Sequence, residues 1–232
     1  MIHKAATHRA IRGLPHMSGH TAKAAAFLSA MEQTPSDIRV DANPADFALM
    51  ERIARGDHEA FGELVARHQD AVVGTVCRML GNFHDAEDIA QQVFLRIWRN
   101  ARRYRPDAKF TTYLFTITRN LVFNETRRRG RKKEVSADER EETAQRAIED
   151  KPEYRPDNEM LQNELRVAVD AAIAALPENQ RMAVVLRRYE QLPYEEIAAV
   201  LALSVPAVKS LLFRARTTLR DALAGYLDDA AG

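Results

Sequence analysis

Apolar residues recur at helical spacing in two separate blocks of this 232-residue chain, and no segment shows the alternation of a β-strand. The first block covers about 45–129 and the second 158–227. Between them, residues 130–157 are rich in Glu, lack an apolar stripe and contain prolines. This pattern predicts an all-α chain in which two small helical domains are joined by a flexible acidic linker, with a short tail at 228–232.

Breaks and caps mark the helices of the first block. A helix begins near Asp46, and Asp57 is the predicted N-cap of the next one. Asp85 is the predicted N-cap of a third helix, because acidic residues follow it in the first turn, where the helix dipole favours them. Pro106 breaks the pattern, and a fourth helix is expected over about 110–129.

The second block ends in a predicted helix-turn-helix. Its helices are expected at about 158–175, 177–190, 194–202 and 205–224. Ser204 is the predicted N-cap of the last helix, whose stripe of Val, Leu and Ala faces inward. The opposite side carries mainly basic residues, together with one aromatic ring: Lys209, Ser210, Phe213, Arg214 and Arg216. A recognition helix in the DNA major groove needs this division into a packed face and a basic face.

The net charge of +1 hides a strong segregation of charge. Residues 96–133 hold thirteen Lys and Arg against two acidic residues, whereas residues 134–164 hold eleven Asp and Glu against four basic residues. Basic patches attract polyanions whatever the net charge of the chain. Two basic patches separated by an acidic segment therefore indicate a nucleic-acid partner.

The fourth helix and the loop before it carry the first basic patch. The loop provides Tyr104, Arg105 and Lys109. One side of the helix collects hydroxyl, amide, aromatic and guanidinium groups: Thr112, Thr116, Arg119, Asn120, Phe123 and Arg127. Planes for base stacking and cations for phosphate are what single-stranded DNA requires, and a base held outside the duplex also needs a pocket.

Several classes of protein are excluded or disfavoured by composition. The single cysteine, Cys77, rules out an internal disulfide and any multi-cysteine zinc site, and its apolar neighbours predict a small buried side chain. No apolar run is long enough to span a membrane. We expect a protein of a reducing cytoplasm with no cofactor and no metal.

Residues 1–44 show no strong periodicity and contain no acidic residue before Glu32. We interpret them as a flexible N-terminal extension. An over-long start is an alternative, since Met17 and Met31 are further initiators, and an acid-poor start also mimics a transit peptide.

Two sets of motifs resemble those of RNA polymerase sigma factors. Residues 85–94 with Trp98, followed by Phe110, 113–114 and 119–120, resemble sigma region 2. The motifs that resemble region 4 lie at 176–181, 194–198 and 208–216. Their order and the small two-domain layout are similar to the extracytoplasmic-function (ECF) group of the sigma-70 family.

The resemblance implies a division of labour between the two domains. The acid-rich third helix would dock on the clamp helices of the largest subunit of core polymerase through Asp85, Glu87, Asp88, Gln91 and Gln92. The loop and the fourth helix would read the melting −10 element with the residues named above. The recognition helix would read the −35 duplex through Lys209, Ser210, Leu211, Phe213, Arg214 and Arg216. The polymerase flap region is a further expected partner, and an anti-sigma factor remains open.

Three positions depart from the family pattern. Leu211 stands where Arg is common, so the −35 preference is expected to differ. Gln92 replaces a usual acid, and Pro193 replaces a usual capping Ser.

Two other classes of function compete with this interpretation. His84 and Asp85, with His58 and His68, superficially suggest a metal-dependent phosphohydrolase, although their spacing matches no known ligand set. An autonomous helix-turn-helix repressor or activator would explain the second domain, but not the acid-led helix or the aromatic basic loop of the first.

Overall fold

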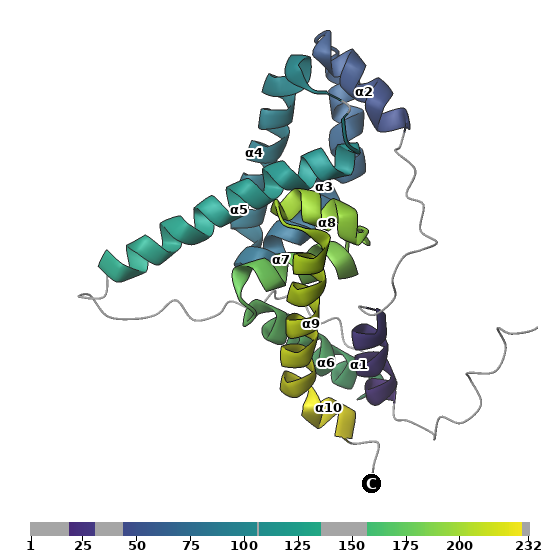
Figure 1. Cartoon of the computed structure of the whole chain (residues 1–232), viewed down its shortest axis with the longest axis vertical. Coiled ribbons are helices and arrows are strands. Elements are labelled where there is room, and N and C mark those ends of the chain that lie inside the picture. Colours follow the sequence, from purple (N-terminus) through teal and green to yellow (C-terminus); the bar gives the residue numbers. More distant parts are fainter. Residues whose placement is uncertain (1–18, 31–43, 106, 136–156, 229–232) are drawn as a thin grey trace, which may run out of the picture.

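The computed structural model describes residues 19–30, 44–105, 107–135 and 157–228, and within these ranges the regular structure is entirely helical. The prediction of an all-α fold is confirmed. Figure 1 shows the helices arranged along one long axis, with α2, α3 and α4 toward one end and α1, α6 and α10 toward the other.

The first domain consists of four α-helices and one short 3-10 helix: α2 (Pro44–Ala54), α3 (His58–Leu80), α4 (Phe83–Asn100), η1 (Ala101–Arg103) and α5 (Phe110–Val135). Helix α3 lies against α2, α4 and α5, so that its apolar stripe forms the centre of the core. Leu64, Val72 and Val76 are fully buried there. The Asp57 carboxylate accepts a hydrogen bond from the Ala60 backbone N–H, which confirms the predicted N-cap.

The N-cap of α4 lies three residues before the predicted one. This N-cap is Asn82, whose side-chain oxygen accepts hydrogen bonds from the backbone N–H groups of His84 and Asp85. The prediction that Asp85 is the cap is therefore wrong. The chain turns earlier because Gly81 adopts a left-handed conformation with φ of 72°, which closes α3 and leaves Asn82 extended and free to cap α4.

Helix α5 is longer than predicted and runs to Val135. Arg and Lys are good helix formers, so the basic run after residue 126 continues the helix rather than starting the linker. Residues 136–156, which hold most of the predicted acidic linker, lie outside the described ranges.

The second domain contains α6 (Asp157–Ala174), α7 (Glu178–Arg188), α8 (Tyr194–Leu201), α9 (Val205–Ala222) and α10 (Ala224–Asp228). Helices α8 and α9 form the predicted helix-turn-helix. Ala202 ends α8 in a left-handed conformation, and the Ser204 hydroxyl accepts a hydrogen bond from the Ala207 N–H, which confirms it as the N-cap of α9. In the part of the chain that is described, no single helix is long and apolar enough to cross a membrane; α8 and α9 reach that length only as a pair bent by 98°.

Helix α1 (Gly19–Ala30) lies inside the stretch predicted to be a flexible extension. Ala24, Phe27 and Leu28 are buried, and the helix lies beside α6, α9 and α10 of the second domain (Figure 1). The Arg188 guanidinium of α7 stands 5.4 Å from the centre of the Phe27 ring. The prediction of an unstructured extension is thus wrong for 19–30, while the rest of 1–43 lies outside the described ranges.

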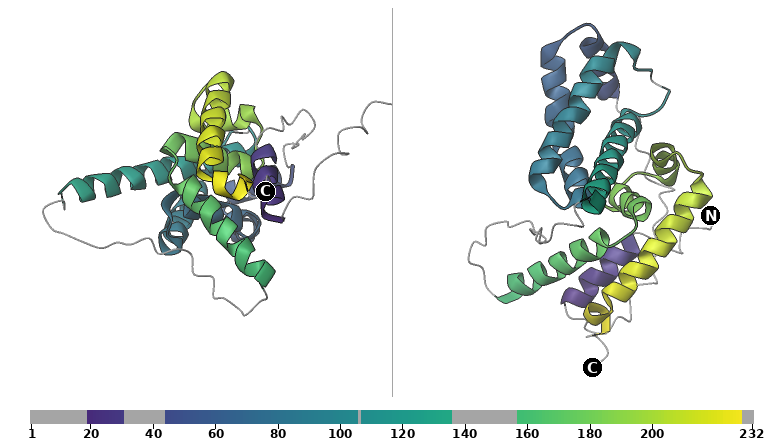
Figure 2. Two further views of the ribbon diagram at one scale, coloured as in Figure 1. Left: turned by 90° about the horizontal axis from the view of Figure 1, so that it is seen from below. Right: turned by 90° about the vertical axis from the view of Figure 1, so that its left-hand side faces the viewer.

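The two domains pack directly against each other. Figure 2 shows α8 beside the first half of α5, and α7 lies against α3. The Thr75 hydroxyl donates to the Glu190 carboxylate at 3.0 Å, and Arg181 donates to the backbone oxygen of Met79 at 2.7 Å. The fold therefore brings the helix-turn-helix against the N-terminal end of the basic helix α5.

Candidate nucleic-acid interface

The recognition helix α9 divides into two faces as the sequence predicts. Val208, Leu212, Ala215 and Leu219 are buried against the second domain. The side chains of Lys209, Ser210, Phe213 and Arg214 are exposed, whereas Leu211 and Arg216 are half-buried. Phe213 is the most exposed large apolar side chain described, with 62% of its surface accessible. The basic face is thus open to a partner.

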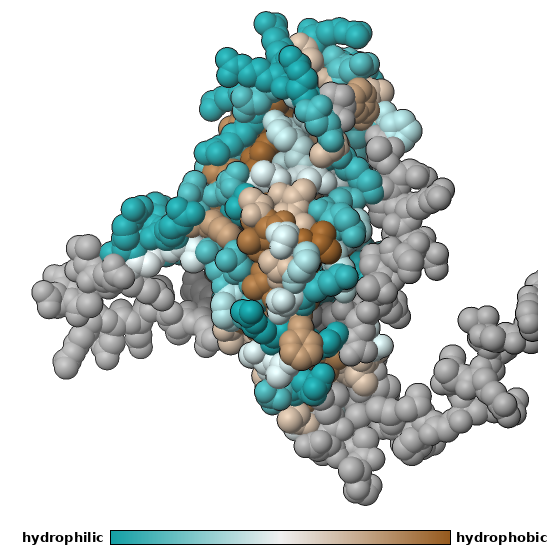
Figure 3. Space-filling model, viewed as in Figure 1, coloured by the Kyte–Doolittle hydropathy of each residue, from teal (hydrophilic) through white to brown (hydrophobic). Residues whose placement is uncertain are grey.

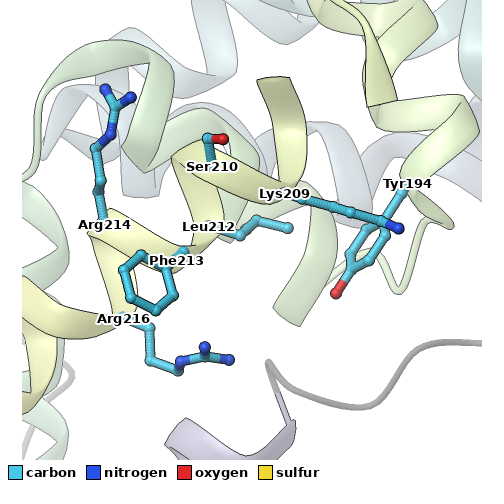
Figure 4. A pocket seen from close by; sticks show the side chains of 7 residues that line it. All are labelled: Tyr194, Lys209, Ser210, Leu212, Phe213, Arg214 and Arg216. Atoms are coloured by element: carbon cyan, nitrogen blue, oxygen red, sulfur yellow. The ribbon is translucent and has the colours of Figure 1, made fainter. Parts of the chain in front are cut away.

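A shallow groove of about 580 Å³ runs along this face (Figure 4). The Phe213 ring lies close to Arg216, whose guanidinium is 5.7 Å from the ring centre. Lys209 extends toward Tyr194 at the start of α8, with the ammonium 6.0 Å from the ring centre. Tyr194 was not predicted as a site residue. The indications in the sequence were its place in the 194–198 motif and its position directly after Pro193, at the start of the first helix of the helix-turn-helix.

A second pocket, of about 370 Å³, lies between the end of α4, η1 and α5. It is lined by three arginines, two tyrosines, an amide and one aliphatic side chain: Arg96, Asn100, Arg103, Tyr104, Arg105, Tyr113 and Ile117. The rings of Tyr104 and Tyr113 are 5.1 Å apart, and Phe47 of α2 supports Tyr104 from behind at 6.2 Å. Aromatic planes beside guanidinium groups form a surface suited to a nucleobase and its phosphates.

Only two lining residues of this pocket, Tyr104 and Arg105, were predicted as site residues. Sequence analysis missed Arg96, Asn100 and Arg103, which follow one another by four and three residues and so share one helical face. Tyr113 was missed as well, because it lies between the apolar and polar sides of α5.

The predicted residues of α5 are placed in different surroundings. Asn120 and Arg127 are exposed, and Arg119 and Thr116 are half-buried, the Thr116 hydroxyl donating to the Thr112 backbone oxygen. Phe123 is buried, with 9% of its surface accessible, so its assignment to the exposed face is wrong. Its ring packs in the core because α5 crosses α4 near this turn.

Lys109 and Thr112, also predicted to contact DNA, lie in the contact between the domains. The Lys109 ammonium forms an ion pair with Glu196 of α8 at 2.6 Å. The hydroxyls of Thr111 and Thr112 stand 3.4 Å from the other carboxylate oxygen of Glu196. Thr112 and Glu196 are both buried, so DNA cannot reach Thr112 in this arrangement of the domains.

The predicted docking face lies on α4. Glu87, Asp88, Gln91 and Gln92 are exposed on it, and Leu95 beside them exposes 47% of its surface. Leu95 was not predicted as a site residue. It is an apolar position on an otherwise polar face.

Asp85, at the start of this helix, forms an ion pair with Arg129 of α5 at 2.5 Å. Arg129 also pairs with Glu125 at 2.9 Å. Hydrogen bonds from Arg128, and then from Arg129, lower the pKa of Glu125 from 4.5 to about 2. The network fastens the first turn of α4 to α5, so the docking face and the basic helix form one rigid unit.

The residues behind the phosphohydrolase hypothesis do not converge. His58 stacks on Trp98 with 4.7 Å between ring centres, and His68 lies 3.1 Å from the Asp46 carboxylate. Across the described ranges, no group of three or more His, Cys, Asp and Glu is placed to hold a metal ion. Cys77 is buried, and burial raises the pKa of its thiol, as expected for a structural side chain.

Figure 3 shows how hydrophilic and apolar residues are distributed over one face of the molecule. Hydrophilic residues cover the exposed length of α5 and the end of the first domain, while apolar residues gather around α8 and the start of α9.

Comparison with known families accounts for both domains. The model of Sigma-70 region 2 matches residues 64–132, and that of Sigma-70 region 4 matches residues 166–219. The chain is 35% identical to the RNA polymerase sigma-H factor of Pseudomonas aeruginosa over 192 residues, covering 80% of this chain and 97% of that protein. It is 37% identical to the ECF RNA polymerase sigma-E factor of Escherichia coli K12 over 177 residues, covering 75% of this chain and 92% of that protein.

Solved structures agree with the sequence comparison. CnrH, in complex with the cytosolic domain of CnrY, matches with a TM-score of 0.57 at 26% identity, covering 78% of this chain and 98% of CnrH. The sigma factor RpoE of Bartonella quintana, in complex with the anti-sigma factor NepR, matches with a TM-score of 0.58 at 25% identity, covering 71% of this chain and 96% of RpoE.

A two-domain helical protein with region 2 and region 4 in this order is a sigma factor. The chain belongs to the ECF group of the sigma-70 family. It binds core RNA polymerase and directs transcription initiation at specific promoters. The family consists of initiation factors rather than enzymes, and the alternative of an autonomous repressor or activator is not favoured.

Proposed function

We propose that the two surfaces described above are the two promoter-reading sites of this sigma factor. The groove on α9 would read the −35 element as duplex DNA, and the pocket between α4 and α5 would hold a base extruded from the −10 element. The predicted domains, 45–129 and 158–227, extend with the helices that bound them to 44–135 and 157–228, so that the linker is shorter than the predicted 130–157. The observation that best supports this proposal is the pocket lined by Tyr104, Tyr113 and Arg96. A base held outside the duplex needs such a pocket, whereas the binding of intact duplex DNA does not.

At the −35 element, α9 supplies three kinds of contact. Lys209 and Arg214 would reach phosphates and guanine edges, and Phe213 would touch a thymine methyl or a sugar. Ser210 and Arg216 complete the groove. Leu211 is half-buried and apolar where an arginine is common in the family, so this position would add no hydrogen bond to a base.

At the −10 element, the pocket would take one base between its aromatic planes. Tyr104 and Tyr113 provide the planes, and Arg105 and Arg103 lie where they can neutralise the flanking phosphates. The exposed Asn120 and Arg127 would follow the strand along α5, with Thr116 and Arg119 beside them. Lys109 and Thr112 become available only when α8 leaves α5. Phe123 supports the helix from within.

Docking on core polymerase is assigned to the exposed face of α4. Glu87, Asp88, Gln91 and Gln92 would contact the clamp helices, with Leu95 as an apolar anchor. The Asp85–Arg129 pair would hold this face in register with the −10 pocket. The second domain would contact the flap region.

The setting of this function is the bacterial cytoplasm, where core polymerase acts. Two of the structural relatives were solved with CnrY and with the anti-sigma factor NepR. By analogy, we propose that an anti-sigma factor regulates this chain. We assign it no catalytic step and no cofactor.

The test is reconstitution with sigma-free core polymerase and a promoter library. We expect a stable complex whose start sites share −35 and −10 sequences. Tyr104→Ala should abolish discrimination at one −10 position and leave the −35 preference unchanged. Tyr226→Ala, a half-buried tyrosine remote from both sites, serves as the matched control. The assignment of the pocket would be refuted if the Tyr104→Ala holoenzyme kept its −10 discrimination. It would also be refuted if Tyr226→Ala lost −10 discrimination to the same extent as Tyr104→Ala.

A further inference from the structure

The pocket between α4 and α5 carries an uneven set of hydrogen-bonding side chains. Its three arginines, Arg96, Arg103 and Arg105, can only donate. The Tyr104 hydroxyl is buried and has no hydrogen-bond partner within the described ranges, so Tyr104 offers the pocket its ring and not its oxygen. The Tyr113 hydroxyl can donate as well as accept, so it does not select for either kind of partner. The pocket is therefore rich in donors and poor in acceptors.

Asn100, the last residue of α4, is the exception among the residues that line this pocket. Its side-chain Nδ2 donates to the backbone oxygen of Arg96, one turn earlier, at 2.8 Å. A backbone oxygen can only accept, so this bond fixes which end of the amide is the nitrogen and leaves Oδ1 to accept a second bond. No described residue donates to this Oδ1. Asn100 therefore gives the pocket a side-chain group that can only accept.

A nucleobase pairs with such an acceptor through an exocyclic amino group. Adenine, cytosine and guanine carry this group, whereas thymine does not. The one ring N–H of thymine stands between two carbonyl oxygens, which repel an approaching Oδ1. We propose that Asn100 is a specificity-determining residue of this pocket, where its Oδ1 accepts a hydrogen bond from a base amino group and disfavours thymine. This inference rests on the proposed −10 function of the pocket.

The position of Arg96 reinforces this choice. Arg96 and Asn100 are four residues apart and share one face of α4, so a donor stands beside the acceptor. In adenine and cytosine, the amino group likewise lies beside a ring nitrogen that accepts a hydrogen bond. These two bases therefore satisfy both residues. A base without an amino group would cover Oδ1 and leave it without a donor, which we expect to weaken binding about fivefold at an exposed residue such as Asn100.

The experiment uses reconstituted holoenzyme and fluorescent single strands that carry the −10 sequence selected by the wild type. The base read by the pocket is identified as the one at which Tyr104→Ala loses discrimination, and we expect it to carry an amino group. It is then replaced by the analogue that lacks only this group: purine for adenine, pyrimidin-2-one for cytosine or hypoxanthine for guanine. Binding by the wild type should weaken about fivefold. Binding by Asn100→Leu should not change with this replacement.

Two further variants separate the contact with the base from effects on the helix. Asn100→Asp keeps an acceptor but cannot donate to the Arg96 backbone oxygen, so it should still depend on the amino group of the base. Asn179→Leu makes the same change as Asn100→Leu at an exposed position of α7 in the second domain. It is the matched control, and it should respond to the analogues as the wild type does.

Two results would overturn the role of Asn100. One is selection of thymine at the position that depends on Tyr104. The other is an equal effect of the analogue on the wild type and on Asn100→Leu, because the amino group and Asn100 would then act independently. In both cases the pocket would remain a base-binding site. If no −10 position depends on Tyr104, the proposed −10 function of the pocket fails, and this inference fails with it.

Discussion

Replacing Phe213 with Ala should weaken −35 recognition without unfolding the second domain. Phe213 exposes 62% of its surface and lies among Lys209, Arg214 and Arg216 on the open face of α9. Its neighbour Leu219, by contrast, is fully buried on the opposite face of the same helix. Substitution of each residue by Ala therefore distinguishes the loss of a DNA contact, which lowers affinity, from the loss of core packing, which lowers the free energy of unfolding.

The magnitudes follow from these exposures. Truncation of a fully buried Leu costs about 2–5 kcal/mol, so Leu219→Ala should lower the free energy of unfolding by that amount. Phe213 buries well under half of its surface, which limits its contribution to about 1 kcal/mol. A central aromatic contact in an interface is worth about 2 kcal/mol, or roughly a thirtyfold change in affinity.

The assay compares holoenzymes on a promoter selected by the wild type and on the same promoter with a scrambled −35 element. Phe213→Ala should bind the intact promoter about thirtyfold more weakly and the scrambled one as the wild type does. Denaturant unfolding of the free protein measures the stability of each variant. If Phe213→Ala destabilises the domain as much as Leu219→Ala does, or keeps its full −35 preference, the ring is not a DNA contact.

Three further predictions concern the scaffold of the sites. Asn82→Ala should cost about 1 kcal/mol of unfolding free energy, because it removes the N-cap of α4, whereas the exposed control His84→Ala should cost little. The lowered pKa of Glu125 means that its ion pairs stabilise the folded protein above about pH 4.5 and lose that effect as the pH falls toward 2. Glu125→Gln should therefore lower the free energy of unfolding by roughly 1–2 kcal/mol at neutral pH. It should also make the free energy of unfolding depend less on pH between those two values, as measured by acid unfolding. Phe27→Ala should lower the unfolding free energy by up to about 3 kcal/mol, which denaturant titration would check, because Phe27 is buried where α1 packs on the second domain. The −10 discrimination of the holoenzyme should stay unchanged, and its loss would contradict a purely structural role of the ring.

Helix positions were largely predictable because caps and breakers act locally. Asp57 and Ser204 satisfy the first N–H groups of their helices, and any chain with such residues before an apolar stripe tends to start there. The prediction chose Asp85 as the N-cap of α4, but Asn82 is an equally good capping residue. Asn82 directly follows Gly81, where the left-handed backbone ends α3, so the helix begins there. Helix α1 was missed because, among its residues whose burial is described, the buried ones are Ala24, Phe27 and Leu28, and alanine carries little hydrophobic signal.

The recognition helix was predictable for the same reason, since its two faces differ along one periodic element. The −10 pocket was only half predictable, because Arg96 and Tyr113 meet through the packing of α4 against α5. Burial of Thr112 and Glu196 was not predictable at all. Both are polar, and they are buried because they contact each other across the two domains. They lie 84 residues apart in the sequence, so no local pattern could predict this contact.

The chemistry of the interfaces decides which parts of this chain move together. Helix α1 precedes the first domain in sequence, but its contacts with the second domain are apolar, through Phe27 and Leu28, and such contacts are costly to expose. The contacts between the domains include charged and polar groups as well, such as the Lys109–Glu196 pair, which water can replace. Helix α1 should therefore move with the second domain whenever the two domains shift relative to each other. Any partner that holds α1 would then restrain the helix-turn-helix rather than the pocket between α4 and α5.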